Sequence, residues 1–121
     1  MFAMAQHEGW TPAGTIGNPL GSVAFRHHNP GNLRSSIFAS SVVDGFCVFS
    51  SDLQGWMALQ YDITMKALGK TSTGLNGEST LIDFLKVWAP SADGNDTAAY
   101  INAVTLVSGL MPTTKLKELL N

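Results

Sequence analysis

Charged side chains are scarce in this chain. Only 13% of its 121 residues are Asp, Glu, Lys or Arg, against about 25% in an average soluble protein. Seven basic and nine acidic residues give a net charge of -2 and a pI near 5.8. A nucleic-acid-binding protein needs a basic face that neutralises several phosphates. The composition therefore argues against nucleic acid as a partner.

Cysteine and long apolar runs are also scarce. Cys47 is the one cysteine, which excludes an intramolecular disulfide, and its apolar surroundings at 46–49 predict a buried, inert thiol. No apolar run approaches the roughly 18 residues that a membrane-spanning helix needs. We therefore expect no membrane span.

The N-terminus lacks the positively charged stretch that opens a secretory signal. If the substrate lies outside the cytoplasm, another agent must deliver the chain. A larger parent protein, a virion and a secretion machine are the expected alternatives.

The first half of the chain predicts a short helix, a long loop and a hairpin. Residues 2–8 are largely apolar and contain no glycine or proline, which favours a buried helix ended by Gly9. Between residues 10 and 32, glycine and proline recur too often for a long regular element, and loops of this length are commonly functional. Two β-prone runs, 36–43 and 46–49, flank the turn dipeptide Asp44-Gly45.

The second half predicts helices. Ser51 or Asp52 can cap a helix that reaches Leu68, is apolar on most sides and is therefore central. Further helices are expected at 81–88, capped by Ser79 or Thr80, at 98–110, capped by Asp96 or Thr97, and at 115–120. The sum is a single α+β domain over residues 1–121, mostly helical, with one small β-hairpin.

Three segments carry a resemblance to a known family. The first joins the helix end Ala5–Trp10, which bears Glu8, to the string Asn29-Pro30-Gly31-Asn32-Leu33-Arg34. The second is the strand-to-helix step formed by residues 45–49 and 55–59. The third runs from Trp88 to Ile101 and contains Asp96-Thr97-Ala98-Ala99-Tyr100. Together they resemble phage-borne and bacterial lysozyme-like proteins that are related to the lytic transglycosylases.

The resemblance implies a lysozyme-like fold in which the hairpin forms one wall of an active-site cleft. It implies an enzyme of the periplasm or cell wall, without a cofactor, that cleaves the MurNAc-GlcNAc glycan backbone of bacterial peptidoglycan. Its catalytic acid/base would be Glu8. The comparison departs in one place, because transglycosylases usually follow this glutamate with serine and this chain has Gly9.

A glutamate suits this chemistry because the leaving sugar oxygen must receive a proton as the glycosidic bond breaks. A helix C-terminus and an apolar neighbour such as Trp10 both disfavour the ionised form of Glu8. The alternative is an ordinary solvated surface carboxylate.

Four further residues are candidates for substrate binding. Asn32 and Arg34 follow a tight turn, where an amide and a guanidinium can hold a carboxylate or bind sugar hydroxyl and amide groups. The resemblance implies that Tyr100 faces Glu8, and the alternative is a half-buried core tyrosine. Trp88 can stack on a sugar ring, although a tryptophan at the end of an apolar helix is more often part of the core.

The type of cleavage stays open. A hydrolase needs a second carboxylate roughly 5 to 9.5 Å from the acid, and the candidates Asp44 and Asp52 occupy a turn and a helix cap where aspartate is expected anyway. A transglycosylase needs only one glutamate, because the 6-hydroxyl of muramic acid attacks internally. The missing second carboxylate favours the transglycosylase.

Two other interpretations remain. The chain can be a non-catalytic glycan-binding or virion structural module, or it can cleave another N-acetylhexosamine polymer such as chitin. A metal site is not expected, because no cysteine or acidic ligand stands at metal-like spacing beside His7, His27 or His28.

Overall fold

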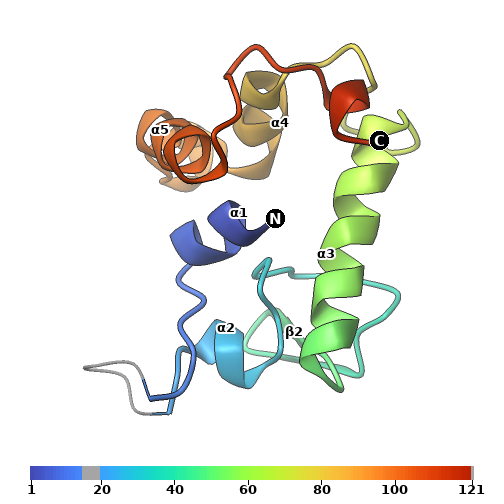
Figure 1. Cartoon of the computed structure of the whole chain (residues 1–121). Coiled ribbons are helices and arrows are strands. Elements are labelled where there is room, and N and C mark those ends of the chain that lie inside the picture. Colours follow the sequence, from blue (N-terminus) through green and yellow to red (C-terminus); the bar gives the residue numbers. More distant parts are fainter. Residues whose placement is uncertain (15–19, 121) are drawn as a thin grey trace. The chain divides into compact units, whose positions relative to one another are not determined.

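The computed structural model describes residues 1–14 and 20–120. The part of the predicted 10–32 loop that falls at 15–19 lies outside the described residues. The elements follow one another as α1 (Phe2–His7), α2 (Val23–Arg26), β1 (Ser41–Val43), β2 (Phe46–Val48), α3 (Asp52–Ala67), α4 (Leu81–Trp88), the 3-10 helix η1 (Ser91–Asp93), α5 (Thr97–Ser108) and the 3-10 helix η2 (Leu116–Leu119) (Figure 1). The described chain is therefore α+β and mostly helical, with one antiparallel hairpin, which confirms the coarse class predicted from the sequence.

The chain divides into two compact units, residues 1–61 and residues 62–121. The first contains α1, α2, the hairpin and the beginning of α3, and the second contains the remainder of α3 and all later elements. The expectation of a single domain over 1–121 stays a prediction.

The hairpin forms where the sequence predicted its turn. Asp44 and Gly45 have φ angles of 51° and 82°, the two positive values that a two-residue type I′ turn requires. Val43 pairs with Phe46 beside that turn, and Val42 pairs with Cys47. Cys47 is fully buried, and burial raises the pKa of its thiol, as expected of an inert core cysteine.

The predicted first strand is too long. Only Ser41–Val43 is strand, and residues 36–40 contain a turn at Ile37 and Phe38. The Ser36 hydroxyl accepts a hydrogen bond from the Phe38 backbone N–H at 3.1 Å, and its carbonyl accepts one from Ala39 at 3.3 Å. Serine bonded in this way offers the backbone an alternative to the strand ladder.

The helix α3 is less buried than predicted. Leu53, Met57 and Tyr61 are exposed, whereas Gly55, Ala58 and Leu59 are buried. The small residues Gly55 and Ala58 are on the buried side, and at Gly55 the backbone of the segment that contains His28 approaches the helix closely. A Cβ atom added at Gly55 would lie 1.8 Å from the carbonyl oxygen of His28.

The helices of the second unit begin at the predicted caps. The Thr80 hydroxyl accepts a hydrogen bond from the Asp83 backbone N–H, and the Asp83 carboxylate accepts one from the Thr80 backbone N–H, which completes a capping box. Asp96 caps α5, which ends at Ser108 because Gly109 adopts a φ of 73°. The predicted helices over 98–110 and 115–120 are therefore shorter than expected, and the last is a 3-10 helix.

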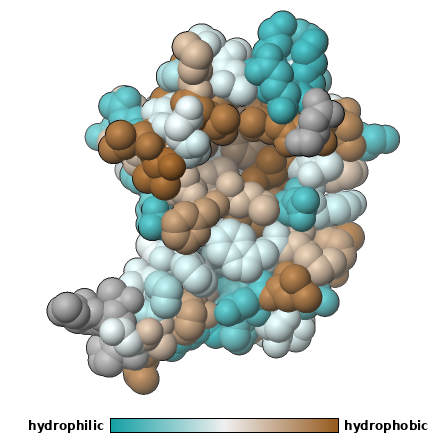
Figure 2. Space-filling view, in the orientation of Figure 1, coloured by the Kyte–Doolittle hydropathy of each residue, from teal (hydrophilic) through white to brown (hydrophobic). Residues whose placement is uncertain are grey.

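The helices α4 and α5 lie side by side in this unit (Figure 1). Their buried residues include Leu81, Phe84, Leu85 and Val104. The outer surface of α5 carries exposed apolar residues, of which Leu106 is 85% exposed. Figure 2 shows hydrophobic side chains over this helix.

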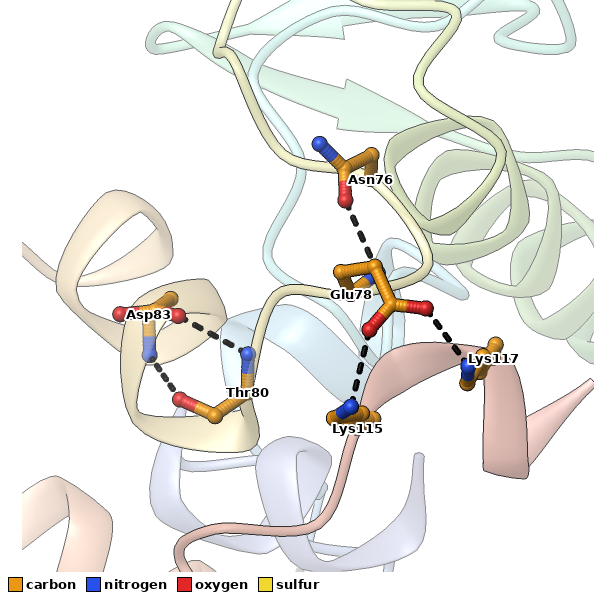
Figure 3. Close-up of polar contacts among 6 residues, drawn as sticks. All are labelled: Asn76, Glu78, Thr80, Asp83, Lys115 and Lys117. Atoms are coloured by element: carbon orange, nitrogen blue, oxygen red, sulfur yellow. Dashed lines mark hydrogen bonds and ion pairs between the residues drawn. The ribbon is translucent and has the colours of Figure 1, made fainter.

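Two lysines tie the end of the chain to the segment before α4. Glu78 accepts hydrogen bonds from Lys115 at 2.9 Å and from Lys117 at 2.6 Å (Figure 3). Backbone bonds from Leu116 to Ser79 and from Lys117 to Gly77 run beside these ion pairs. Hydrogen bonds from both lysines, followed by the attraction of their charges, lower the pKa of Glu78 to about 2.

The close approach at Gly55 yields a test of the first unit. We expect Gly55→Ala to destabilise the protein by about 1–3 kcal/mol, because the new methyl group would overlap the His28 carbonyl. Urea denaturation measures the loss. The exposed Gln60→Ala in the same helix is the control, and an equal or smaller loss for Gly55→Ala would contradict the contact.

The pKa of Glu78 yields a test of the second unit. Because this pKa is lowered, the stability that the ion pairs contribute is present above about pH 4.5 and lost as the pH falls towards 2. A carboxyl-carbon NMR titration should give a midpoint near 2, and a midpoint much closer to 4.5 in the double variant Lys115→Gln, Lys117→Gln. The double variant Lys70→Gln, Lys86→Gln, which also removes two exposed lysine charges, is the charge-matched control. An unchanged midpoint in the double variant would show that the lysines do not hold this carboxylate.

Candidate active site

Glu8 stands at the C-terminal cap of α1. The Gly9 N–H donates to the Gln6 carbonyl at 3.1 Å and the Trp10 N–H donates to the Ala5 carbonyl at 2.9 Å, the two bonds of a Schellman motif. Gly9 takes a φ of 87° there, which explains why glycine follows the glutamate in this chain. Glu8 is half-buried and its backbone is fixed by the helix end.

Trp10 anchors the chain directly after Glu8. Its ring makes edge contacts with Phe25 and with Trp56, each at a centroid distance of 5.6 Å. These contacts bring α2 and the start of α3 to the segment that leaves the glutamate. Trp56 therefore packs inside the first unit.

A buried amide organises the motif that follows. Asn29 is 1% exposed, and its Nδ2 donates to the carbonyls of Leu33 and Cys47, both at 3.0 Å. Its Oδ1 accepts from the Leu33 N–H at 2.9 Å. Backbone bonds from Cys47 to Leu33 and from Phe49 to His27, each 2.9 Å, place the 27–33 segment along β2. Asn29 thus joins its own turn to the hairpin.

The turn itself is tight. His28 and Asn32 have φ angles of 54° and 52°, in the left-handed region that few non-glycine residues adopt. Gly31 lies against Leu59, where an added Cβ would come within 2.7 Å of a methyl carbon. The turn residues therefore serve both backbone geometry and packing on α3.

The structure brings Asn32 to Glu8. The Asn32 Nδ2 donates to the Glu8 Oε2 at 3.4 Å, a long hydrogen bond of a kind common in ligand-free sites. Both residues were predicted to belong to one site from segments 24 positions apart.

Arg34 precedes the hairpin, and its side chain packs on the hairpin and not on Glu8. Its guanidinium stacks over the Phe46 ring, 4.5 Å from the centroid, and its Nη1 lies beside Gly45. It is exposed and makes no ion pair with Glu8. Of the two motif side chains predicted to line the site, only Asn32 contacts the glutamate.

The two candidate second carboxylates each have another role. Asp44 occupies the first position of the hairpin turn at a φ of 51°. Asp52 opens α3 and its Oδ1 lies 2.7 Å from the His28 Nδ1, so it ties the helix start to the turn. Ser51, the other predicted cap, accepts a hydrogen bond from the Gln54 N–H.

The remaining candidates belong to the second unit. Trp88 stacks on Phe84 at 5.8 Å with an interplanar angle of 22°, and the Lys66 Nζ lies 5.4 Å from its ring centroid. Both neighbours favour the core interpretation of Trp88. Tyr100 is 3% exposed on α5, and its pairing with Glu8 stays a prediction.

The described residues 1–14 and 20–120 contain no group of three His, Cys, Asp or Glu side chains that could hold a metal ion. None of their helices combines the length and apolar character needed to cross a bilayer.

Comparisons with protein-family models, curated proteins and solved structures found no match to this chain. Asn29 is a residue of the site to which the sequence interpretation gave no role, although it belongs to the Asn-Pro-Gly-Asn-Leu-Arg string. The signal available in the sequence was the position of this polar residue, Asn29, in a segment that packs against the apolar strand β2.

The network of Asn29 can be tested directly. We expect Asn29→Ala to cost about 2–3 kcal/mol, because it removes three buried hydrogen bonds. Urea denaturation measures the cost, with the exposed Asn102→Ala on α5 as the control. A cost no larger than that of the control would show that the amide does not hold the turn.

Proposed function

We propose that this chain is a lysozyme-like enzyme that cleaves the MurNAc-GlcNAc backbone of bacterial peptidoglycan, most simply as a lytic transglycosylase. Glu8 is its general acid/base. One observation carries the proposal: the amide of Asn32, from the Asn-Pro-Gly-Asn-Leu-Arg string, reaches the carboxyl of Glu8. Two segments singled out by the same family resemblance thus meet at one polar contact.

The contact suits a proton donor. The Asn32 amide donates to Oε2, so that oxygen is used as an acceptor and the proton of the neutral carboxyl is directed to Oε1. A carboxyl held in this way can protonate the leaving sugar oxygen as the glycosidic bond breaks. Asn32 is then a positioning residue for Glu8.

Internal cyclisation is favoured over hydrolysis by the roles of the other carboxylates. Asp44 is committed to the turn, and Asp52 is paired with His28. With one carboxyl, Glu8 first gives its proton to the leaving oxygen. As a carboxylate it then accepts the proton of the muramic acid 6-hydroxyl, whose oxygen bonds to the anomeric carbon and closes the anhydro ring.

Peptidoglycan digestion followed by mass spectrometry of the released fragments tests this function. Wild type should release fragments with anhydromuramic ends. Glu8→Gln should lower the rate by about 100- to 10,000-fold, the range that general acid-base catalysis supplies. Glu118→Gln, the same change at an exposed site, should keep full activity.

The other outcomes are equally informative. Reducing ends would identify a hydrolase and return attention to Asp44 and Asp52. No fragments from wild type would contradict an enzyme and favour a glycan-binding or virion structural module.

A further inference from the structure

Arg34 is a fixed cation with unused hydrogen-bond donors. The Lys and Arg residues of the first unit are Arg26 and Arg34. Arg26 donates to the Gly21 carbonyl at 2.8 Å, whereas no described residue accepts a hydrogen bond from Arg34 or pairs with its charge. Stacking on Phe46 holds the guanidinium in place without consuming its five N–H groups.

The backbone before Arg34 is fixed as well. The Leu33 N–H donates to the Asn29 side chain, and the Leu33 carbonyl accepts from both Asn29 and Cys47. The Arg34 side chain is therefore positioned at its base by the backbone and at its tip by the Phe46 ring. A ligand that binds there does not have to order a free arginine side chain.

Beside this cation lies an apolar strip. Val43 and Phe46 are directly opposite in the hairpin, so their side chains share one face. Val43 is 45% exposed and Phe46 half-buried. Asp44, the acidic residue of the hairpin, makes no ion pair with Arg34. The face offers an unneutralised guanidinium next to small apolar surfaces.

The backbone that carries Arg34 lies near the candidate catalytic group. Asn32, which contacts Glu8, is two residues from Arg34, and two residues span at most about 7 Å of chain. A ligand of the size of a disaccharide with an attached peptide, seated at Glu8, can therefore extend to Arg34.

We propose that Arg34, with Val43 and Phe46, binds a carboxylate of the peptide stem that muramic acid carries. Peptide stems combine free carboxylates with alanine methyl groups, which matches a cation beside an apolar strip, and a guanidinium can bind a carboxylate through two parallel hydrogen bonds. The inference rests on the proposed function and adds a specificity to it: stem-bearing peptidoglycan is preferred over uncharged glycans such as chitin.

Calorimetry with full-length Glu8→Gln, which should not consume the ligand, tests the site. The probes are a GlcNAc-MurNAc disaccharide with an alanyl-glutamate stem and the same compound with its stem carboxyls converted to amides. The acid form should bind about 10-fold more tightly, the value expected of a charge-assisted hydrogen bond. In Glu8→Gln, Arg34→Gln this preference should disappear, while Glu8→Gln, Lys86→Gln should keep it.

A preference that survives Arg34→Gln, or binding of neither probe, would overturn the assignment. The result is separable from the proposed function. If wild type releases fragments but the preference for the acid form does not depend on Arg34, only the stem site is wrong. If the preference depends on Arg34 but wild type releases no fragments, the stem site is supported and the catalytic proposal is wrong.

Discussion

One buried amide, that of Asn29, holds together the part of the chain on which the candidate site depends. Its side chain bonds the backbone of Leu33 and of Cys47, and so fixes the turn to the hairpin. Non-glycine residues in the left-handed region cost energy, and His28 and Asn32 stand there on either side of Asn29-Pro30-Gly31. The three bonds of Asn29 offset that cost and leave Asn32 aimed at Glu8.

Two glycines, which have no side chain, allow α3 to approach this turn closely. Gly55 faces the His28 carbonyl, and Gly31 faces Leu59. Neither glycine has a positive φ, so both are required by space and not by backbone conformation. The glycine in the Asn-Pro-Gly-Asn-Leu-Arg string is therefore explained by a helix that follows it by more than twenty residues.

Local signals in the sequence predicted local structure well. The Asp44-Gly45 turn, the Thr80 cap and the helix end at Gly9 each depend on a few neighbouring residues. Interactions between residues far apart in the sequence could not be predicted from such local signals. The bonds of Asn29 to Cys47 and the loss of strand at 36–40 depend on partners and competitors that periodicity does not reveal. For the site, the family resemblance linked Glu8 to Asn32, and neither propensity nor spacing would have done so.

The two halves of the Glu8–Asn32 contact differ in how they form. The helix end that carries Glu8 is closed by bonds among residues 5–10, whereas the position of Asn32 depends on a strand 15 or so residues further on, through Cys47. Opening of the hairpin would break the Cys47 bond and release Asn32, even where the residues of α1 keep their own hydrogen bonds. Helical content would then overestimate the fraction of molecules with an assembled site, because the stability of the hairpin contributes to that of the site.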